Sequence, residues 1–202
     1  MRKINVRGVA VSAIMGVVGF VLMCLEFALP AIIPSFIKLD FSELPALITA
    51  FAFGPVYGVL VCLVKNLLHL FITSSAGVGE LSNFILGAVF TFTAGLVYKR
   101  KKTRGRALAG SLFGAAAMAA VSVVTNYFFV YPAYTVLYGM PREVIVKMYS
   151  AILPASDTLL KSLIIFNVPF TFFKGVAAAV LCFAVYKRLS FILKGAKGKN
   201  NS

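Results

Sequence analysis

Ionisable and amide side chains lie inside long apolar stretches of this chain, where they are costly to bury. Lys65, Asn66 and His69 follow one another closely, and spacings of three and four residues share a helical face. Asn126 and Lys174 lie in two later apolar stretches, each about one and a half helical turns from a proline. Lysine donates hydrogen bonds, and an amide both donates and accepts them. These residue types predict recognition of a polar ligand inside a membrane protein.

Each of these residues also has an ordinary structural interpretation. A lysine in a membrane helix can extend its aliphatic stem to the lipid headgroups, and Asn126 can hold two helices together. His69 can be a packed polar residue, and Glu26 lies close enough to a helix end to be merely exposed. Counted from the ends of the apolar stretches, all these groups fall in the outer half of the membrane. This convergence favours one polar pocket that opens outward.

Sequence patterns typical of catalysis are lacking. There is no GxxxxGK[ST] phosphate loop, no HExxH and no GxSxG, and His69 is the only histidine. No two carboxylates share one helical face, which disfavours acid/base catalysis. Cys24, Cys62 and Cys182 are widely spaced within apolar segments, which indicates packing rather than a metal site or a disulfide. We therefore expect neither an enzyme nor a protein that hydrolyses ATP by itself, and we expect no metal or cofactor.

The elements that must position these residues are helices that cross a membrane. Hydrophobic residues make up 60% of the chain and charged residues 13%, which is far from the composition of soluble domains. Of the 20 lysines and arginines, 14 lie before the first apolar stretch, at 99–106 or at 187–199, and no acidic residue does. The positive-inside rule therefore predicts a multi-pass protein of the cell membrane with both termini in the cytoplasm. Anionic lipid explains the basic charge, so no nucleic-acid partner is expected.

The apolar stretches predict an all-α integral membrane protein with six transmembrane helices in a single domain over residues 1–202. A glycine followed by a proline at Gly54-Pro55 divides one long apolar region into two short helices. An outer loop with an interfacial helix is expected at 139–162, and a disordered tail at 195–202. The expected transmembrane helices cover residues 8–29, 43–53, 55–73, 80–98, 107–131 and 167–187.

Two further segments suggest contacts with other molecules. The outer loop from Pro34 to Pro45 is too apolar for a simple solvated connector. It could fold over a flat aromatic ligand as a lid, or it could dip into the bilayer interface. In the first helix, small residues recur every four positions at Gly8, Ser12 and Gly16. Such a pattern lets another helix approach closely.

Short motifs in a specific order link the chain to a known family. The segments are Leu39-Asp40-Phe41-Ser42-Glu43-Leu44-Pro45, Phe53-Gly54-Pro55-Val56-Tyr57-Gly58, Lys65-Asn66-Leu67-Leu68, Asn83-Phe84 with Gly87, Asn126-Tyr127-Phe128, and Pro169-Phe170 with Lys174-Gly175. On these motifs, nearly the whole chain resembles the riboflavin-specific substrate-binding (S) component of energy-coupling factor (ECF) vitamin transporters.

The resemblance implies a six-helix S component that captures riboflavin from outside with high affinity. Members of the family work as part of an ABC-type transporter, together with a transmembrane coupling protein and two ATP-binding subunits. Riboflavin would be the transported ligand and not a cofactor. Two alternatives stay open. One is an S component for another vitamin or for FMN, and the other is a membrane carrier that works without ATPase subunits.

The resemblance also implies roles for particular residues. Asn126 and Lys174 would form hydrogen bonds to the vitamin, and its ring system would lie near the outer loop. Some family members carry asparagine where this chain has Thr171, so that contact would be shorter or bridged by water. The implied ligand-binding set is Leu39, Asp40, Phe41, Lys65, Asn66, Asn126, Thr171 and Lys174. The implied docking face for the coupling protein consists of Ser12, Ala13, Gly16 and Gly19.

Overall fold

The protein is a bundle of helices with one short strand pair. The computed structural model describes residues 5–194, with side chains as far as residue 185, so the tail expected at 195–202 lies outside the described residues. The helices are α1 Val6–Cys24, α2 Glu43–Phe53, α3 Pro55–His69, α4 Val78–Arg100, α5 Arg104–Thr125, α6 Tyr131–Tyr138, α7 Arg142–Ser150, α8 Leu159–Ser162 and α9 Val168–Lys194. The strands β1 Phe27–Ala28 and β2 Lys38–Leu39 pair antiparallel. Short 3-10 and π segments are η1 Leu70–Ile72, η2 Asn126–Val130 and η3 Leu163–Asn167.

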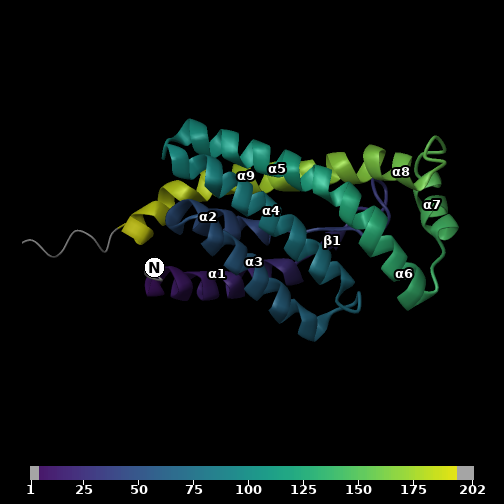
Figure 1. Ribbon diagram of the computed structural model, residues 1–202, viewed down its shortest axis with the longest axis horizontal. Helices are drawn as coiled ribbons and strands as arrows, with labels where there is room; N and C mark the ends of the chain where they lie inside the picture. The colour runs from purple at the N-terminus through teal and green to yellow at the C-terminus, as the bar shows by residue number, and fades with distance from the viewer. Residues whose placement is uncertain (1–4, 195–202) are drawn as a thin grey trace, which may run out of the picture.

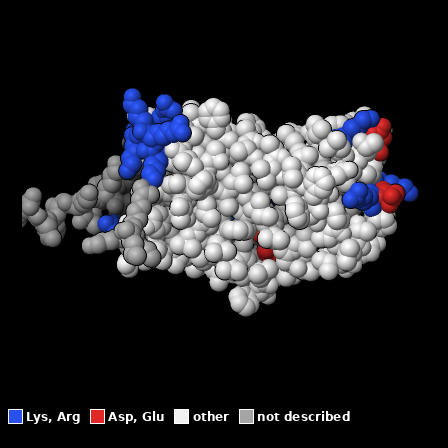
Figure 2. Space-filling model, in the orientation of Figure 1, with Lys and Arg blue, Asp and Glu red and all other residues white. Residues whose placement is uncertain are grey.

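The bundle has two different ends. The start of α1, the turn between α4 and α5 and the end of α9 lie at one end, and α6, α7 and α8 lie at the other (Figure 1). Figure 2 shows lysines and arginines gathered at the first end, where the exposed residues 99–106 connect α4 to α5. Both signs of charge appear at the opposite end in the same view. This asymmetry in space follows the asymmetry in the sequence.

Five helical stretches within the described residues are long and apolar enough to cross a membrane. They are Val6–Cys24, Pro55–Ile72, Val78–Arg100, Arg104–Tyr138 and Leu159–Val185, and the apolar helix α2 is shorter. The structure therefore places a helix in each of the six expected regions. That all six cross the membrane, and that both termini are cytoplasmic, stay predictions.

The ends of two helical stretches differ from the sequence prediction. Pro132 does not end the fifth helix, which continues to Tyr138, and Pro169 does not begin the last one, which starts at Leu159. Only α7 and the turn after it form the outer segment, which was expected to reach residue 162. Both helical stretches continue through their proline because a π-helical turn comes directly before it. The turns η2 and η3 each end two residues before the proline. Such local adjustments allow a membrane helix to continue through a proline.

Small residues bring neighbouring helices together. At Gly114 in α5, a Cβ atom would lie 2.6 Å from the backbone oxygen of Phe90 in α4, so only glycine fits there. At Gly16 in α1, a Cβ atom would lie 2.5 Å from the side chain of Val64 in α3. Close helix packing of this kind is how membrane helices associate without a hydrophobic driving force.

The small-residue stripe of α1 is a contact within the chain. Ser12, Gly16 and Gly19 are buried, and the hydroxyl of Ser12 donates a hydrogen bond to the carbonyl oxygen of Tyr57 in α3 at 3.2 Å. Of the implied docking residues, only Ala13 is exposed. Another protein would have to displace α3 to reach the three buried ones. The stripe therefore forms the α1–α3 contact in this structure, and docking of a coupling protein at Ser12, Ala13, Gly16 and Gly19 stays a prediction.

The outer loop is closed at its base by a hairpin that the sequence analysis did not predict. Phe27 pairs with Leu39, and Ala28 pairs with Lys38. Lys38 also forms an ion pair with Glu26. Directly before the outer loop begins at Pro34, Ile33 is fully buried in a hydrophobic cluster with Tyr131 and Tyr149. The loop is thus held down at both ends over the bundle.

Candidate functional site

A cavity of about 170 Å³ lies at the end of the bundle opposite the basic cluster. It is enclosed by the outer loop, the first turns of α4, the segment from α5 to α6, and the start of α9. Its aliphatic and aromatic lining includes Met23, Phe36, Ile37, Leu86, Met118, Val130, Tyr131, Tyr134 and Phe170. Its polar lining includes Glu26, Lys38, Asp40, Glu43, His69, Ser75, Glu80, Asn83, Asn126, Asn167, Thr171 and Lys174. A mainly apolar surface with convergent polar groups is typical of a small-molecule site.

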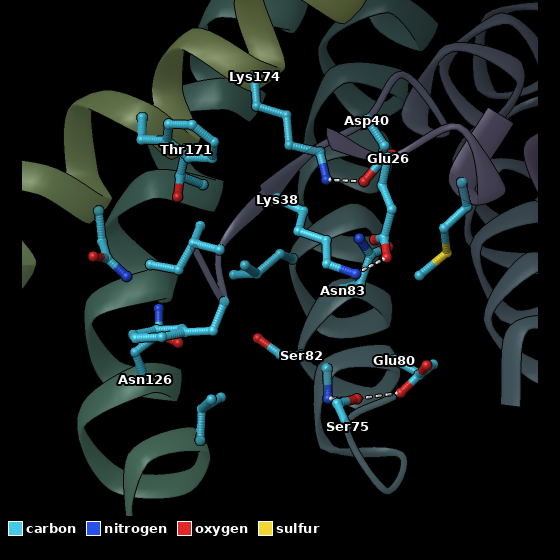
Figure 3. Close-up of a pocket in the computed structure, with 18 of the residues that line it drawn as sticks. Glu26, Lys38, Asp40, Ser75, Glu80, Ser82, Asn83, Asn126, Thr171 and Lys174 are labelled. Carbon is cyan, nitrogen blue, oxygen red and sulfur yellow. Dashed lines mark hydrogen bonds and ion pairs between the residues drawn. The ribbon is translucent and has the colours of Figure 1, made fainter. Parts of the chain in front are cut away.

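Lys174 is held by two carboxylates where the outer loop meets α9. Its ammonium nitrogen lies 2.8 Å from Oδ2 of Asp40 and 3.4 Å from Oε2 of Glu43 (Figure 3 shows the first contact). The Lys174 side chain is 12% exposed, so it is largely withdrawn from water yet still lines the cavity. Buried charges are tolerated when they are paired in this way.

Lys65 completes a buried cluster of two positive and two negative groups. Its ammonium nitrogen lies 2.8 Å from Oε1 of Glu43 and also donates a hydrogen bond to the hydroxyl of Ser42. Glu43 therefore connects Lys65 in α3 to Lys174 in α9. The side chain of Lys65 is fully buried and does not line the cavity. Its role in this arrangement is to neutralise part of the negative charge next to Lys174.

Asp40 stays ionised in this cluster. Burial alone would raise the pKa of its carboxyl group, but the positive charges of Lys174 and Lys65 and the hydrogen bond from Lys174 lower it further than burial raises it. The net result is a pKa well below the usual range for aspartate. The second oxygen of Asp40 accepts a hydrogen bond from the backbone N–H of Ser42 at 2.8 Å, which shapes the turn into α2.

Asn126 and Thr171 lie on the other side of the cavity from Glu26 and Asn83 (Figure 3). Asn126 begins the π-helical turn η2, and Thr171 lies in the first turn of α9. Asn167 lies one turn before Thr171, and its side-chain oxygen accepts a hydrogen bond from the Tyr149 hydroxyl at 2.6 Å. The two π-helical turns therefore bring amide groups of separate helices to one cavity wall.

A further set of hydrogen-bonded polar side chains lies where α3 connects to α4. Nδ1 of His69 lies 2.8 Å from Oε1 of Glu80, and the Ser75 hydroxyl donates to Oε2 of Glu80 at 2.7 Å. The Thr73 hydroxyl accepts from the backbone N–H groups of Ser75 and Gly77 and holds the turn in place. These bonds fix the α3–α4 turn against the cavity.

The structure brings together half of the residues that the sequence analysis assigned to ligand binding. Asp40, Asn126, Thr171 and Lys174 line the cavity, although they come from three distant parts of the chain. The other four lie away from its surface, and they are Leu39, Phe41, Lys65 and Asn66.

Simple geometry explains why those four residues are elsewhere. Leu39 is buried and lies between Lys38 and Asp40, and neighbouring side chains of a strand point in opposite directions. Phe41 contacts the ring of Phe27 in the hairpin, with centroids 6.5 Å apart. The Asn66 side chain donates to the carbonyl oxygen of Cys62 in its own helix at 2.8 Å. Of the three polar residues on α3, only His69 lines the cavity.

Several polar lining residues were not assigned to the site from sequence. Glu43 and Asn83 occur within the motifs that carried the family resemblance, and Glu80 is one of only six acidic residues in the chain. Asn167 is the first residue of the last expected helix, 167–187. Glu43 and Glu80 could have been predicted from their positions at the ends of apolar stretches. A carboxylate that is buried there needs a positively charged or hydrogen-bonding partner.

The fold and the cavity define a polytopic membrane protein with a small-molecule site at one end of its helices. Residues 7–186 match the family model of the ECF transporter substrate-specific component, and the chain belongs to this family. It is therefore a multi-pass protein of the cell membrane and a substrate-specific component of a transporter.

Relatives of known name agree with this assignment. The chain is 30% identical over 196 residues to the riboflavin transporter RibU of Staphylococcus aureus, covering 96% of this chain and 97% of the relative. It is 31% identical to the riboflavin transporter FmnP of Bacillus subtilis, covering 92% and 93%. A solved S component of a bacterial ECF transporter superposes with a TM-score of 0.72 at 32% identity, covering 93% of this chain and 98% of that one. These relatives are transport proteins, not enzymes.

Proposed function

We propose that this chain is the riboflavin-binding S component of an ECF-type transporter and captures the vitamin with high affinity from outside the cell. The observation that carries the proposal is a cavity in which Lys174, Asn126 and Thr171 meet aromatic side chains, in a chain whose relatives are named riboflavin transporters. Riboflavin has a flat, largely apolar ring system and a chain of hydroxyl groups. A cavity with apolar walls and few polar groups suits such a molecule.

Asp40, Asn126, Thr171 and Lys174 are the proposed ligand contacts. In the described arrangement Lys174 is already paired with Asp40. Riboflavin would accept a hydrogen bond from the same ammonium group, which has three donors and so can serve a carboxylate and a ligand together. For the other four residues we propose supporting roles. Leu39, Phe41 and Asn66 pack against their neighbours, and Lys65 neutralises the charge of Glu43.

Binding also requires the cavity to widen. Pockets for small molecules usually enclose roughly 300–1,000 Å³, whereas this cavity encloses about 170 Å³. The outer loop is the element that we expect to move outward, because its Phe36 and Ile37 line the cavity, and this movement has to separate Phe36 from the rings of Tyr131 and Tyr134. Phe36 and Ile37 of this loop would then close over the ring system.

The charges of the lining favour riboflavin over FMN. Four carboxylates line the cavity, from Glu26, Asp40, Glu43 and Glu80, whereas two lysine ammonium groups do, from Lys38 and Lys174. Both of these lysines are already paired with carboxylates, so a phosphate group would have to compete with Glu26, Asp40 or Glu43 for a positive charge. We therefore expect the neutral vitamin to bind more tightly than its phosphate ester.

A direct titration tests the ligand. Protein purified from riboflavin-free medium should quench the fluorescence of added riboflavin with one site per chain. Thiamine and biotin at the same concentrations should not compete, and FMN should compete only at higher concentration. Saturable binding of thiamine or biotin, without binding of riboflavin, would assign the chain to another vitamin.

Transport itself is proposed to need partners, namely a transmembrane coupling protein and two ATP-binding subunits. Lipid vesicles that contain only this chain should take up no riboflavin against a gradient, with or without ATP inside. Co-reconstitution with the other ECF subunits should give ATP-dependent uptake. Concentrative uptake by the chain alone would support a self-sufficient carrier instead.

A further inference from the structure

Three buried polar side chains form a closed triad of hydrogen bonds beside the cavity. They are Tyr131 at the start of α6, Tyr149 in α7 and Asn167 at the end of η3. The hydroxyl groups of the two tyrosines bond to each other, and the Tyr149 hydroxyl lies 2.6 Å from Oδ1 of Asn167. The third side is closed by Nδ2 of Asn167, which lies 3.4 Å from the Tyr131 hydroxyl. The triad therefore joins three elements that are well separated in the sequence.

The chemistry of the three groups fixes the direction of each hydrogen bond. A separation of 2.6 Å is typical of an O–H···O bond and too short for most N–H···O bonds, so the amide atom next to Tyr149 is the oxygen. An amide oxygen only accepts, which makes Tyr149 the donor. Because a hydroxyl has one hydrogen, the Tyr149 oxygen then accepts from Tyr131, and the Tyr131 oxygen accepts from the Asn167 nitrogen.

The members of the triad differ in their relation to the cavity. Asn167 lines the cavity together with Tyr131, whereas Tyr149 is fully buried behind them and is not part of the lining. The nitrogen of Asn167 carries two N–H groups. The triad uses one of them, so the second can donate to a molecule in the cavity. Tyr149 can influence such a molecule only through the residues that it holds.

The orientation of the Asn167 amide depends on Tyr149. The terminal torsion of an asparagine side chain is broad and roughly two-fold, so an amide without a fixed partner can turn either its oxygen or its nitrogen towards a ligand. The Tyr149 hydroxyl removes this freedom because it binds the oxygen. The cavity is then offered a hydrogen-bond donor at this point of its wall.

We propose that Tyr149 is a positioning residue for riboflavin binding, which holds Oδ1 of Asn167 so that the amide offers an N–H group to an acceptor atom of the vitamin. This inference rests on the proposed riboflavin function. It extends the residues that determine affinity beyond the cavity lining to α7, the helix of the outer segment.

A double-mutant cycle on riboflavin affinity tests the positioning role. Tyr149→Phe keeps the aromatic ring and removes the hydroxyl, so riboflavin should bind about 3- to 10-fold more weakly, as expected for one neutral hydrogen bond. Asn167→Ala should weaken binding at least as much. Adding Tyr149→Phe to Asn167→Ala should cause no further loss, because Tyr149 then has no amide left to hold. Fluorescence titration of the purified full-length proteins measures all four affinities.

Tyr98 in α4 provides a matched control. It is partly buried, packs against Phe51 with ring centroids 4.8 Å apart, and lies outside the cavity lining. Tyr98→Phe removes the same hydroxyl group from a residue that cannot orient Asn167. Its affinity for riboflavin should equal that of the wild type.

Three results would overturn the inference. Tyr149→Phe could bind riboflavin as the wild type does, Asn167→Ala could do so, or Tyr149→Phe could weaken binding by the same factor in both backgrounds. The last result would show that Tyr149 only supports the packing of α7, because a packing defect does not depend on Asn167. Asn167→Ser completes the comparison if the alanine variant cannot be purified. Failure of the wild type to bind riboflavin would instead reject the proposed function, so the two failures are distinguishable.

Discussion

Lys65 and Lys174 carry the same charge and share the carboxylate of Glu43, yet they occupy different surroundings. Lys65 in α3 is fully buried and lines no cavity. Lys174 in α9 is 12% exposed and faces the cavity. The comparison shows that an ionisable residue within a membrane helix is a candidate for ligand binding, but its position in the sequence does not establish that role. Contact with the cavity decides which of the two lysines can touch a ligand.

The largest expected effect is loss of stability in Lys65→Met. Removing one partner of a buried ion pair typically costs about 3–5 kcal/mol, because the remaining charge is buried without compensation. Of its ion pairs within the described residues, Glu43 would keep the longer one with Lys174 at 3.4 Å, together with a 3.5 Å hydrogen bond from the Ser42 hydroxyl. Thermal unfolding of the purified protein in detergent should show a clear decrease in melting temperature.

A double variant provides the control for Lys65. Lys65→Met combined with Glu43→Gln should recover part of the lost stability, since both charges are then removed together. A Lys65→Met protein that melts like the wild type but no longer binds riboflavin would contradict the structural role of Lys65 and would indicate that it contacts the ligand, as proposed for Lys174.

The second effect is loss of binding in Lys174→Met. A hydrogen bond to a charged group contributes about 1.5–3 kcal/mol, so riboflavin affinity should fall about 10- to 100-fold. Some loss of stability should accompany it, because Asp40, whose side chain is 2% exposed, loses its 2.8 Å partner. Titration with riboflavin and thermal unfolding in parallel separate the two effects. Unchanged affinity in a folded protein would show that Lys174 only supports Asp40.

The smallest effect concerns pH. The pKa of Asp40 is lowered in the folded protein, because Lys174 and Lys65 more than offset the effect of burial. A lowered pKa means that the ion pair contributes fully above the unfolded-state pKa of about 4. The contribution is lost only as the pH falls from there towards the folded-state pKa.

Comparison with Asp40→Asn isolates this contribution from every other titrating group. The difference in melting temperature between wild type and variant should stay constant from pH 8 to about pH 5. It should shrink only in more acidic solution. A difference that already declines between pH 7 and pH 6 would show that Asp40 is not strongly paired.

The helices could be predicted because their signals are local. The apolar stretches and the break at Gly54-Pro55 gave α2 and α3 with end residues close to those of the structure. The extent of the helices around Pro132 and Pro169 could not be predicted in the same way. A π-helical turn depends on what packs around it, and the residues next to a proline do not show whether one will form.

The site could be predicted only in part, because the partners of a buried group come from elsewhere in the chain. Asn126 and Lys174 were recognised as polar residues in apolar helices, and both line the cavity. Lys65 carried the same signal but is turned towards Glu43. Tyr149 lies in the outer segment and carries no such signal, so its hydrogen bond to Asn167 becomes evident only from the surrounding atoms.

The sequence by itself determined that this chain is a helical membrane protein with its basic loops on one side. Length, apolar composition and the placement of 14 of its 20 lysines and arginines suffice for that conclusion, since each acts through the bilayer and needs no tertiary contact. Only the tertiary structure decided which buried polar groups neutralise one another and which face a cavity. Pairing and exposure depend on distances between α3, α4, α9 and the outer loop, and these distances exist only once the helices have packed.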